Sequence, residues 1–124
     1  YNEGVDVILP ICGGASQGVI ATAKELGFYI SWFDDNGFSK APGYVISSSA
    51  MEQEKMAYEV ATKYFEGKIE FGTATTVDIK DGYITLITDD ANFENHFSES
   101  YKENLKDEYN KIKEGVIILE SPEV

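Results

Sequence analysis

A pair of glycines, Gly13 and Gly14, follows the apolar run of residues 5–9 in the stretch GVDVILPICGGASQGV. Helix-forming residues resume within a few positions, so the glycines connect a strand to a helix. Backbone N–H groups exposed at such a helix start can bind polar or weakly anionic ligand atoms. The stretch matches neither the dinucleotide-binding pattern nor the phosphate-loop pattern of glycines. The glycines therefore indicate a ligand-binding loop at the carboxyl end of a strand, with a purely structural turn as the alternative.

Two adjacent acids, Asp34 and Asp35, stand at the end of a second apolar run, residues 28–33. Paired carboxylates can accept hydrogen bonds from sugar hydroxyls, and they can also act as general acid and base or help to hold a cation. The spacing of a calcium-binding loop is not met, because Gly43 stands where the terminal glutamate of such a loop would be. Residues 34–37 can also form an ordinary solvated turn that uses Asn36 and Gly37. The acids therefore predict a polar turn at a strand end, with ligand binding as one use.

Catalysis through a nucleophile has few candidate residues. Cys12 is the only cysteine and His96 the only histidine, and no recognisable motif surrounds His96. A single cysteine excludes an internal disulfide and a cysteine-cluster metal site. We expect Cys12 to be a small buried side chain and His96 to lie on the surface, not to act as nucleophile and base. The sequence therefore favours a protein that is not an enzyme and has no metal or cofactor.

The charge composition argues against nucleic-acid binding. The 124 residues include 22 Asp and Glu against 10 Lys and Arg, a formal net charge of −12, which repels a phosphate backbone. All ten basic residues are lysines, so no planar guanidinium can clamp a phosphate or a carboxylate. No apolar run approaches the roughly 18 residues of a membrane span. With 43% hydrophobic residues the chain can bury one core, and we expect residues 1–124 to form a single unit.

The first half of the sequence alternates between strand and helix patterns. We expect strands at residues 5–9, 28–33 and 44–47, and helices at residues 15–27 and 50–66. Ser16 is a possible N-cap of the first helix, and Gly27 and Gly67 end the two helices. The continuous apolar runs are typical of strands buried on both faces of a parallel sheet. This half therefore predicts an α/β fold.

The second half does not continue that alternation. Residues 71–79 and 83–88 predict a β-hairpin with Asp81 and Gly82 at its turn. Residues 98–115 have the spacing of an amphipathic helix closed by Gly115, residues 116–119 predict a short last strand, and an acidic tail follows. The predicted architecture is thus a parallel sheet with flanking helices plus a hairpin. The first residue, Tyr1, is not methionine, so we expect a piece or a mature product of a longer chain.

Four stretches, taken in order, resemble the basic membrane protein family, the PnrA-like solute-binding lipoproteins of bacterial ABC transporters. The first, GVDVILPICGGASQGVIATAKELG, is similar to the family's strand, Ala-Gly-Gly turn and helix. ISWFDDNG lies where the family has a strand ending in Gly-Val-Asp-x-Asp-Gln. The family's strand, serine pair and helix resemble GYVISSSAMEQEKMAYEVATKYFEGK, and its glycine hairpin resembles FGTATTVDIKDGYITLI. The resemblance extends from Gly4 to about Gly115, and the order and spacing of the stretches carry it.

The resemblance implies the carboxyl-terminal portion of a two-lobed periplasmic-binding-protein fold of type I (Rossmann-like), whose lobes close around a solute by hinge motion. It implies the substrate-binding component of an ABC importer for purine nucleosides or a related small solute. The partners would be that solute and the transporter permease. The full-length protein would be exported, periplasmic or at the cell surface, with a lipid anchor on its amino terminus. Because the amino-terminal lobe is absent, we expect the fragment to self-associate through the hairpin and the last helix.

The same resemblance assigns site residues. Gly13 and Gly14 would line the cleft and help to position the base or the ribose. Asp34 would bind the ribose, with Asp35 as the alternative if the alignment shifts by one residue. Met51 stands where the family often has a lysine that reaches the ligand.

Two departures from the family pattern lie directly before the aspartate. Trp32 and Phe33 replace a small Gly-Val pair there, which could narrow or redirect the pocket. Two other interpretations stay open: a small α/β enzyme that uses Asp34 or Asp35, and an interaction domain that binds no small ligand.

Overall fold

The computed structural model describes residues 1–118. Its strands are β1 (Val7–Ile8), β2 (Tyr29–Asp34), β3 (Val45–Met51) and β4 (Ile84–Leu86). Its α-helices are α1 (Ser16–Leu26), α2 (Gln53–Phe65), α3 (Ala91–His96) and α4 (Glu99–Lys113), and two short 3-10 helices are η1 (Gly13–Ala15) and η2 (Phe38–Lys40). Among these described helices, none has both the length and the apolar character that a bilayer crossing needs.

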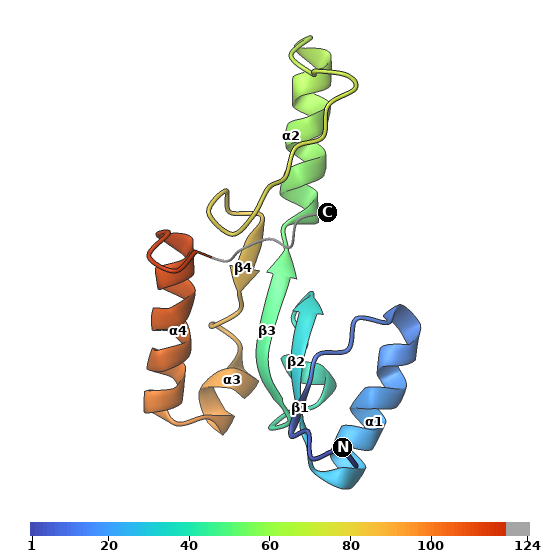
Figure 1. The fold of residues 1–124 in the computed structure, drawn as a ribbon, viewed down its shortest axis with the longest axis vertical. Helices are drawn as coiled ribbons and strands as arrows, with labels where there is room; N and C mark the ends of the chain where they lie inside the picture. The colour runs from blue at the N-terminus through green and yellow to red at the C-terminus, as the bar shows by residue number, and fades with distance from the viewer. Residues whose placement is uncertain (119–124) are drawn as a thin grey trace.

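The four strands form one open sheet in the order β1-β2-β3-β4. β1, β2 and β3 run parallel, and β4 is antiparallel to β3. α1 lies to one side of the sheet and α3 and α4 to the other (Figure 1). The α/β class predicted from the sequence is therefore confirmed. Since parallel strands end at the same edge of a sheet, the residues that follow β1 and β2 meet at one edge.

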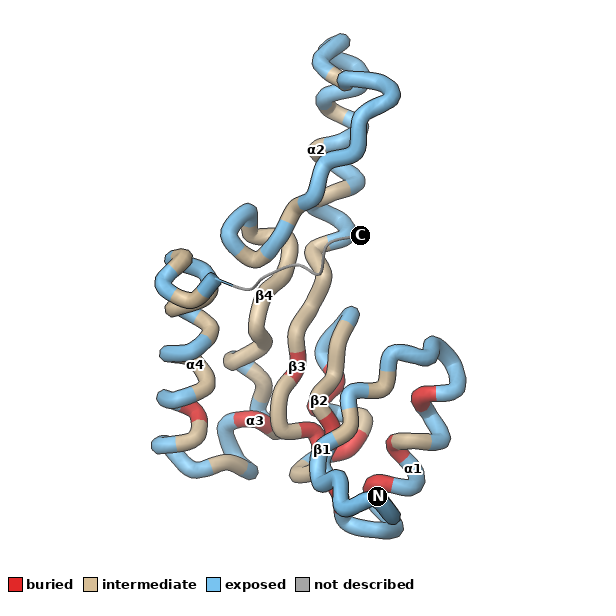
Figure 2. Tube along the Cα trace, viewed as in Figure 1, coloured by how far each residue is buried: buried red, intermediate tan, exposed pale blue. Residues whose placement is uncertain are grey.

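A small apolar core anchors the amino-terminal halves of β2 and β3. The rings of Phe38 and Phe93 pack with centroids 5.2 Å apart, and Ile30 and Val45 are fully buried beside them. The buried apolar set consists of Ile20, Ala23, Phe28, Ile30, Phe38, Ala41, Val45 and Phe93. Figure 2 shows these buried positions gathered around the lower half of the sheet and the inner side of α1. The carboxyl ends of the strands are left accessible.

The helix α2 projects away from the sheet, with the returning chain beside it (Figure 1). None of its residues is buried, and Figure 2 shows most of it as exposed. Large apolar side chains are in solvent here, with Tyr58 73% and Phe65 85% exposed. The helix begins later than the predicted residue 50, because β3 continues through Ala50 to Met51. A surface helix normally packs its apolar side chains against another element, and α2 buries none of its residues within the described chain.

The predicted hairpin of residues 71–79 and 83–88 is wrong in its first strand. Its turn does form, with Gly82 at a φ of 73° and the Asp78 carbonyl accepting from the Tyr83 N–H at 3.2 Å. Residues 71–79 have no regular structure, and β4 pairs with β3 through Met51 and Ile84 instead. The edge of β3 offers unpaired backbone groups, and β4 satisfies them.

The last part of the described chain is helical. α4 matches the predicted helix, with Ser98 as its N-cap accepting from the Tyr101 N–H at 3.3 Å. The short helix α3 was not predicted, and Asp90 caps it by accepting from the Asn92 N–H at 2.7 Å. The predicted strand at residues 116–119 is absent over residues 116–118, and Leu119 and the acidic tail lie outside the described residues.

The first strand is shorter and more exposed than the sequence predicts. Only two residues of the predicted run 5–9 are paired, and Val5, Val7 and Leu9 are 45%, 42% and 52% exposed. The reason is that β1 is an edge strand, with β2 as its only partner in the described chain. No strand in the described chain pairs with the outer edge of β1, and the apolar side chains of residues 5–9 stay largely exposed to solvent.

Candidate functional site

The glycine loop lies where the sequence places it, between the end of β1 and the start of α1. Gly13 has a φ of 57°, in the left-handed region that favours glycine. A Cβ atom built on either Gly13 or Gly14 would meet no other atom within 4 Å. The two glycines therefore expose bare backbone to open space, instead of packing against another part of the chain.

The start of α1 has no side-chain cap. Its N-cap residue is Ala15, and the predicted cap, Ser16, is already the first residue of the helix. The Ser16 hydroxyl is directed elsewhere, donating to the Pro10 carbonyl at 3.4 Å and lying 3.3 Å from Cys12 Sγ. The prediction that Ser16 caps the helix is therefore wrong. No side chain caps α1, but η1 runs directly into it: the Ser16 N–H donates to the carbonyls of Gly13 and Gly14, and the Ala15 N–H donates to the Cys12 carbonyl at 3.3 Å. These two N–H groups are therefore already satisfied within the chain.

Asp34 ends β2 at the same edge of the sheet. Its φ is 90°, and it is the only non-glycine residue of the described chain with a positive φ. The residue is exposed, and no hydrogen bond or ion pair engages its carboxylate within the described residues. A non-glycine residue in this region of φ is strained, and such residues gather at ligand sites.

Asp35 differs from its neighbour because its carboxylate is already bound. Trp32 Nε1 donates to Asp35 Oδ1 at 2.6 Å, and Lys40 Nζ lies 3.1 Å from Asp35 Oδ2. The Lys40 ammonium also lies 5.0 Å from the centroid of the Trp32 ring. Asp35 is therefore held on the side of Trp32 and Lys40, and the geometry favours Asp34 over Asp35 as a ligand-binding acid.

Residues of the glycine loop and the end of β2 enclose a small hollow, here called the Asp34 hollow. Its lining residues are Pro10, Ile11, Cys12, Gly13, Ser16, Trp32, Phe33 and Asp34. Its volume is about 60 Å³, whereas sites for small organic ligands enclose about 300–1,000 Å³. The Asp34 hollow is therefore too small to enclose such a ligand by itself. Gly13 and Asp34 line it together, while Gly14, Asp35 and Met51 are not among its lining residues.

Met51 is at the end of β3, next to the strand position that faces Asp34. Asp34 pairs with Ala50, and Met51 pairs with Ile84 of β4. Side chains alternate along a strand, so Met51 lies on the opposite face of β3 from Ala50. The structure therefore does not bring Met51 together with the Asp34 hollow.

Cys12 and His96 lie at opposite ends of the sheet. Cys12 follows β1 at the carboxyl edge, and it is exposed, so the prediction that it is buried is wrong. His96 ends α3 and packs near Gly43, before the amino end of β3, with Nδ1 2.8 Å from the Asn92 oxygen. His96 is exposed as predicted. The histidine is not placed to act as a base for the cysteine.

The turn that follows Asp34 is tied to α3. Asn36 Nδ2 donates to Asp90 Oδ2 at 2.9 Å, and Asn36 Oδ1 accepts from the Phe38 N–H at 3.1 Å. The hydrogen bond from Asn36 holds the pKa of the Asp90 carboxyl below its usual value of 3.8. Asp90 is therefore ionised at neutral pH and serves both the turn and the cap of α3.

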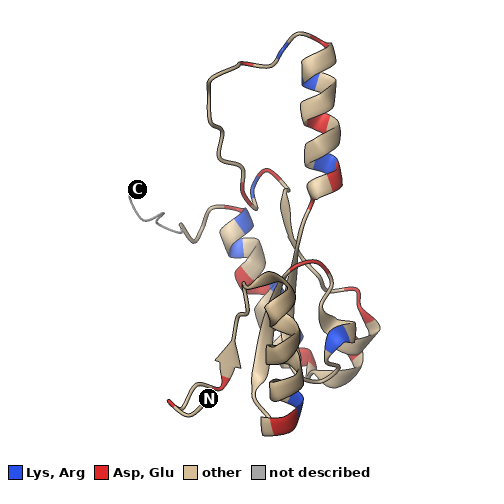
Figure 3. Ribbon diagram, turned by 90° about the vertical axis from the view of Figure 1, so that its right-hand side faces the viewer, with Lys and Arg blue, Asp and Glu red and all other residues tan. Residues whose placement is uncertain are grey.

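Charges of both signs follow one another along the exposed helices α2 and α4 (Figure 3). Neither helix presents a purely basic face of the kind that binds a phosphate backbone. Within the described residues, no group of three or more histidine, cysteine, aspartate or glutamate side chains is arranged to hold a metal ion.

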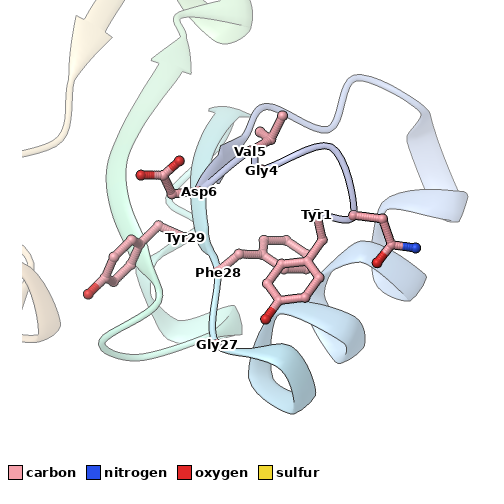
Figure 4. Close-up of a pocket in the computed structure, with 8 residues that line it drawn as sticks. Tyr1, Gly4, Val5, Asp6, Gly27, Phe28 and Tyr29 are labelled. Atoms are coloured by element: carbon pink, nitrogen blue, oxygen red, sulfur yellow. The ribbon is translucent and has the colours of Figure 1, made fainter.

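A larger hollow of about 550 Å³ lies at the other end of β1 and β2. Figure 4 shows Tyr1, Phe28 and Tyr29 around it, and the rings of Tyr1 and Phe28 have centroids 6.0 Å apart. It lies at the amino ends of the strands, beside the first residues of the chain. Open α/β sheets bind ligands at the carboxyl ends of their strands, so the Asp34 hollow, although smaller, is the better candidate.

The model of one protein family, described as "ABC transporter substrate-binding protein PnrA-like", matches residues 1–122. The chain belongs to this PnrA-like family. Its members are substrate-binding proteins of ABC transporters and not enzymes, which disfavours the alternative of a small α/β enzyme. The resemblance noted in the sequence is thereby confirmed.

Two curated relatives are basic membrane proteins of Borreliella burgdorferi. Basic membrane protein D of Borreliella burgdorferi strain JD1 is 33% identical over 109 residues, covering 86% of this chain and 32% of the relative. Basic membrane protein C of strain N40 is 30% identical over 128 residues, covering 99% of this chain and 35% of the relative. The chain thus spans about one third of the length of these relatives.

A solved structure has the same fold. The crystal structure of a transcriptional activator of the comK gene from Bacillus halodurans matches with a TM-score of 0.75 at 20% identity. The match covers 96% of this chain and 40% of that one. At this identity the likeness concerns the fold alone.

Sequence reasoning missed two residues that shape the site. Ser48 was not singled out from the sequence, yet it is fully buried and bonded to the turn after Asp34. Trp32 was noted as a departure from the PnrA-like pattern, but its bond to Asp35 was not foreseen. Polar side chains in the middle of an apolar strand are the signal that could have identified Ser48, because a buried hydroxyl needs a partner.

Proposed function

We propose that the protein to which this chain belongs is the substrate-binding component of a bacterial ABC importer, and that it binds a purine nucleoside or a related small solute. The carrying observation is the exposed carboxylate of Asp34, which has no hydrogen-bond or ion-pair partner within residues 1–118 and belongs to a residue that lines the same small hollow as Gly13. Membership of the PnrA-like family supports the binding role.

The chemistry of the Asp34 hollow suits a sugar hydroxyl. An ionised carboxylate accepts two hydrogen bonds and donates none, which matches the two adjacent hydroxyls of a ribose. Backbone N–H groups at Gly13 and Gly14 would donate to acceptor atoms of the base or the ribose. In this proposal Asp34 fixes the ribose, and the glycine loop fixes the remaining polar atoms.

We propose that residues 1–124 are one unit, the carboxyl-terminal portion of a two-lobed protein. The relatives are about three times as long, and α2 exposes an apolar face that nothing in the described chain covers. The Asp34 hollow also lacks the volume of a complete site. A second lobe, contributed by the rest of the protein, would cover α2 and supply the opposite wall.

Met51 is proposed as a solute contact on the resemblance alone, because in this structure it does not line the Asp34 hollow. In the PnrA-like resemblance it stands in place of a lysine that reaches the ligand, and here it lies one residue beyond the partner of Asp34. A thioether removes a positive charge from that position, so the solute would lose one charged contact.

The setting of the protein follows from the proposed role. The solute would be delivered to a transporter permease, and the protein would be exported, periplasmic or at the cell surface. A lipid anchor on the amino terminus would hold it at the membrane. These assignments come from the resemblance and await a test on the full-length protein.

The isolated 124-residue chain is proposed to self-associate. The hairpin expected to mediate this does not form, and the exposed apolar residues of α2 take its place: Tyr58, Val60, Tyr64 and Phe65. A contiguous exposed apolar surface favours association. Light scattering at high protein concentration should give a mass above that of the monomer, and a monomer would contradict the proposal.

Calorimetric titration of the full-length protein with adenosine, guanosine and inosine tests the function. Asp34→Ala should weaken binding of the preferred nucleoside about a hundredfold, because it removes charged hydrogen bonds of about 1.5–3 kcal/mol each. Glu25→Ala, which removes an exposed carboxylate from α1, is the matched control and should leave the affinity unchanged. Asp35→Ala should weaken binding less than Asp34→Ala, because Asp35 is bonded to Trp32 and Lys40. Folded wild-type protein that binds none of the three would move the ligand to another class of solute.

A further inference from the structure

Ser48 of β3 is bonded to the turn that follows Asp34. Its side chain is 0% exposed, and it pairs with Trp32 of β2. Ser48 Oγ donates to the Asp35 backbone oxygen at 2.8 Å and accepts from the Gly37 N–H at 2.9 Å. One buried hydroxyl thus satisfies two backbone groups of residues that come just after Asp34.

The backbone of Asp34 needs such support. Its φ of 90° is a conformation that a residue with a side chain rarely adopts. Strained conformations persist only where the surrounding structure determines them. If residues 35–37 could relax, Asp34 would return to a negative φ, and its carboxylate would leave the Asp34 hollow.

The other side of the turn is closely packed. A Cβ atom on Gly37 would lie 2.3–2.6 Å from the Cβ, Cγ and Cδ1 atoms of Trp32. The Trp32 indole in turn holds the Asp35 side chain. The turn is therefore fixed by the Trp32 ring on one side and by the Ser48 hydroxyl from within the sheet.

We propose that Ser48 is a positioning residue, which holds residues 35–37 so that Asp34 keeps its left-handed backbone and presents its carboxylate to the solute. The inference rests on the proposed function, because it takes Asp34 as the residue that binds the solute. Ser48 does not line the Asp34 hollow, so its effect on binding passes through Asp34.

The same two strands supply a matched control. Ser31 Oγ and Ser47 Oγ share a hydrogen bond of 2.7 Å, and this pair is adjacent to the pair of Trp32 and Ser48 in the register. Neither hydroxyl contacts the turn. Ser47→Ala therefore removes a hydroxyl and a hydrogen bond from β3 without releasing residues 35–37.

Calorimetry with inosine on the full-length protein separates positioning from stability. Ser48→Ala should weaken inosine binding about tenfold, as expected when one supporting hydrogen bond of the binding residue is lost. Ser47→Ala should leave the affinity unchanged while lowering the melting temperature, and Ser48→Thr, which keeps the hydroxyl, should restore binding. Unchanged affinity in Ser48→Ala, or an equal loss in Ser47→Ala, would overturn the proposal.

Amide hydrogen exchange of Gly37 tests the same contact without any ligand. In the wild-type protein this amide should be protected like those of β3, and Ser48→Ala should remove the protection while Ser47→Ala retains it. Exchange of the wild-type Gly37 amide at the rate of an exposed loop would overturn the proposal, even if Ser48→Ala failed to fold.

A crystal structure of the Ser48→Ala protein completes the test. Asp34 should be found at a negative φ, and a φ still near the wild-type value would overturn the proposal. If wild-type protein binds no inosine but Gly37 protection and the φ of Asp34 both depend on Ser48, the positioning role is supported and the nucleoside assignment alone fails.

Discussion

Trp32 Nε1 donates a hydrogen bond of 2.6 Å to Asp35 Oδ1, and this contact separates two adjacent aspartates that the sequence cannot tell apart. With Lys40 on its other oxygen, Asp35 has two partners. Asp34 is left with its carboxylate free at the Asp34 hollow. The indole of Trp32 thus occupies Asp35 and leaves Asp34 as the acid without a side-chain partner in the described part of the chain.

The bond between Trp32 and Asp35 can be measured by a double-mutant cycle. Trp32→Phe keeps an aromatic ring but removes the donor, and Asp35→Ala removes the acceptor. We expect a coupling free energy of about 0.5–1 kcal/mol in urea unfolding followed by circular dichroism, because the pair is partly exposed to solvent. Additive effects of the two substitutions would show that the bond does not contribute to stability.

Alanine substitutions at Gly37 and at Gly18 should change the free energy of unfolding in opposite directions. Gly37→Ala should lower the free energy of unfolding by about 1–3 kcal/mol, because the new methyl group must displace the ring. Gly18→Ala, on the exposed side of α1 with nothing within 4 Å, should raise it by about 0.5 kcal/mol, because alanine favours a helix. A neutral Gly37→Ala would contradict the packing described here.

The reactivity of Cys12, which lines the Asp34 hollow, can report whether a solute occupies that hollow. Cys12 is exposed and unpaired, so it should react with N-ethylmaleimide. If inosine binds there, a concentration of about ten times its Kd should slow the reaction about tenfold, since about one tenth of the sites stay free. Mass spectrometry of the peptide that contains Cys12 measures the rate.

The control for this labelling experiment is Asp34→Ala. In that variant inosine should give no protection at the same concentration. An unchanged labelling rate in wild-type protein, at concentrations where calorimetry shows saturation, would mean that the solute binds away from the Asp34 hollow.

The ion pairs of Lys102 predict a pH dependence of stability. Lys102 is 3% exposed and contacts Glu94 at 2.7 Å and Glu99 at 2.5 Å. The hydrogen bond from Lys102 lowers the pKa of Glu94 below 4.5, and the hydrogen bond to Glu94, then that to Glu99, raises the pKa of Lys102 above 10.5. Stability from Glu94 is therefore complete above pH 4.5 and is lost as the pH falls through the lowered pKa.

The alkaline side has the opposite sign. Stability from Lys102 is complete below pH 10.5 and is lost as the pH rises through the raised pKa. Urea midpoints of Lys102→Met protein should depend less on pH on both sides. Part of each dependence should remain, because Lys106 also pairs with Glu94 at 3.7 Å and the pKa of Lys111 is raised by its hydrogen bonds to Asp107 and Glu108. Lys111→Met, which removes the ion pairs of Lys111 with Asp107 and Glu108 on α4, is the control and should keep the acid dependence set by Glu94. An acid dependence as large in Lys102→Met as in the wild-type protein would assign it to other carboxylates.

Elements with complete local signals were predicted well. α1 ends at Gly27, which has a φ of 83°, and α4 begins after its cap Ser98. Helical periodicity and capping residues act over a few neighbouring positions, so one segment contains all the information. The strand β2 was also predicted from a local signal, the apolar run of residues 28–33 that is followed by Asp34 and Asp35.

Elements that depend on distant partners were predicted poorly. Residues 71–79 carry a strand pattern but stay irregular, because β4 takes the edge of β3 instead. The end of β3 was assigned to a helix, although its pairing with Ile84 keeps Met51 extended. Backbone hydrogen bonds between strands join residues far apart in the chain, and local patterns do not choose between competing partners.

The sequence by itself determined the α/β class, the family, the glycine loop and the placement of acids after the second strand. Parallel strands end at one edge, so these signals already brought Gly13 and Asp34 to the same side of the sheet. Only the tertiary structure decided that Asp34 lines a hollow together with Gly13, while the carboxylate of Asp35 is bonded to Trp32 and Lys40. The physical reason is that a buried hydroxyl on β3 and an indole on β2 set the backbone of that turn, and neither contact leaves a local trace in the sequence.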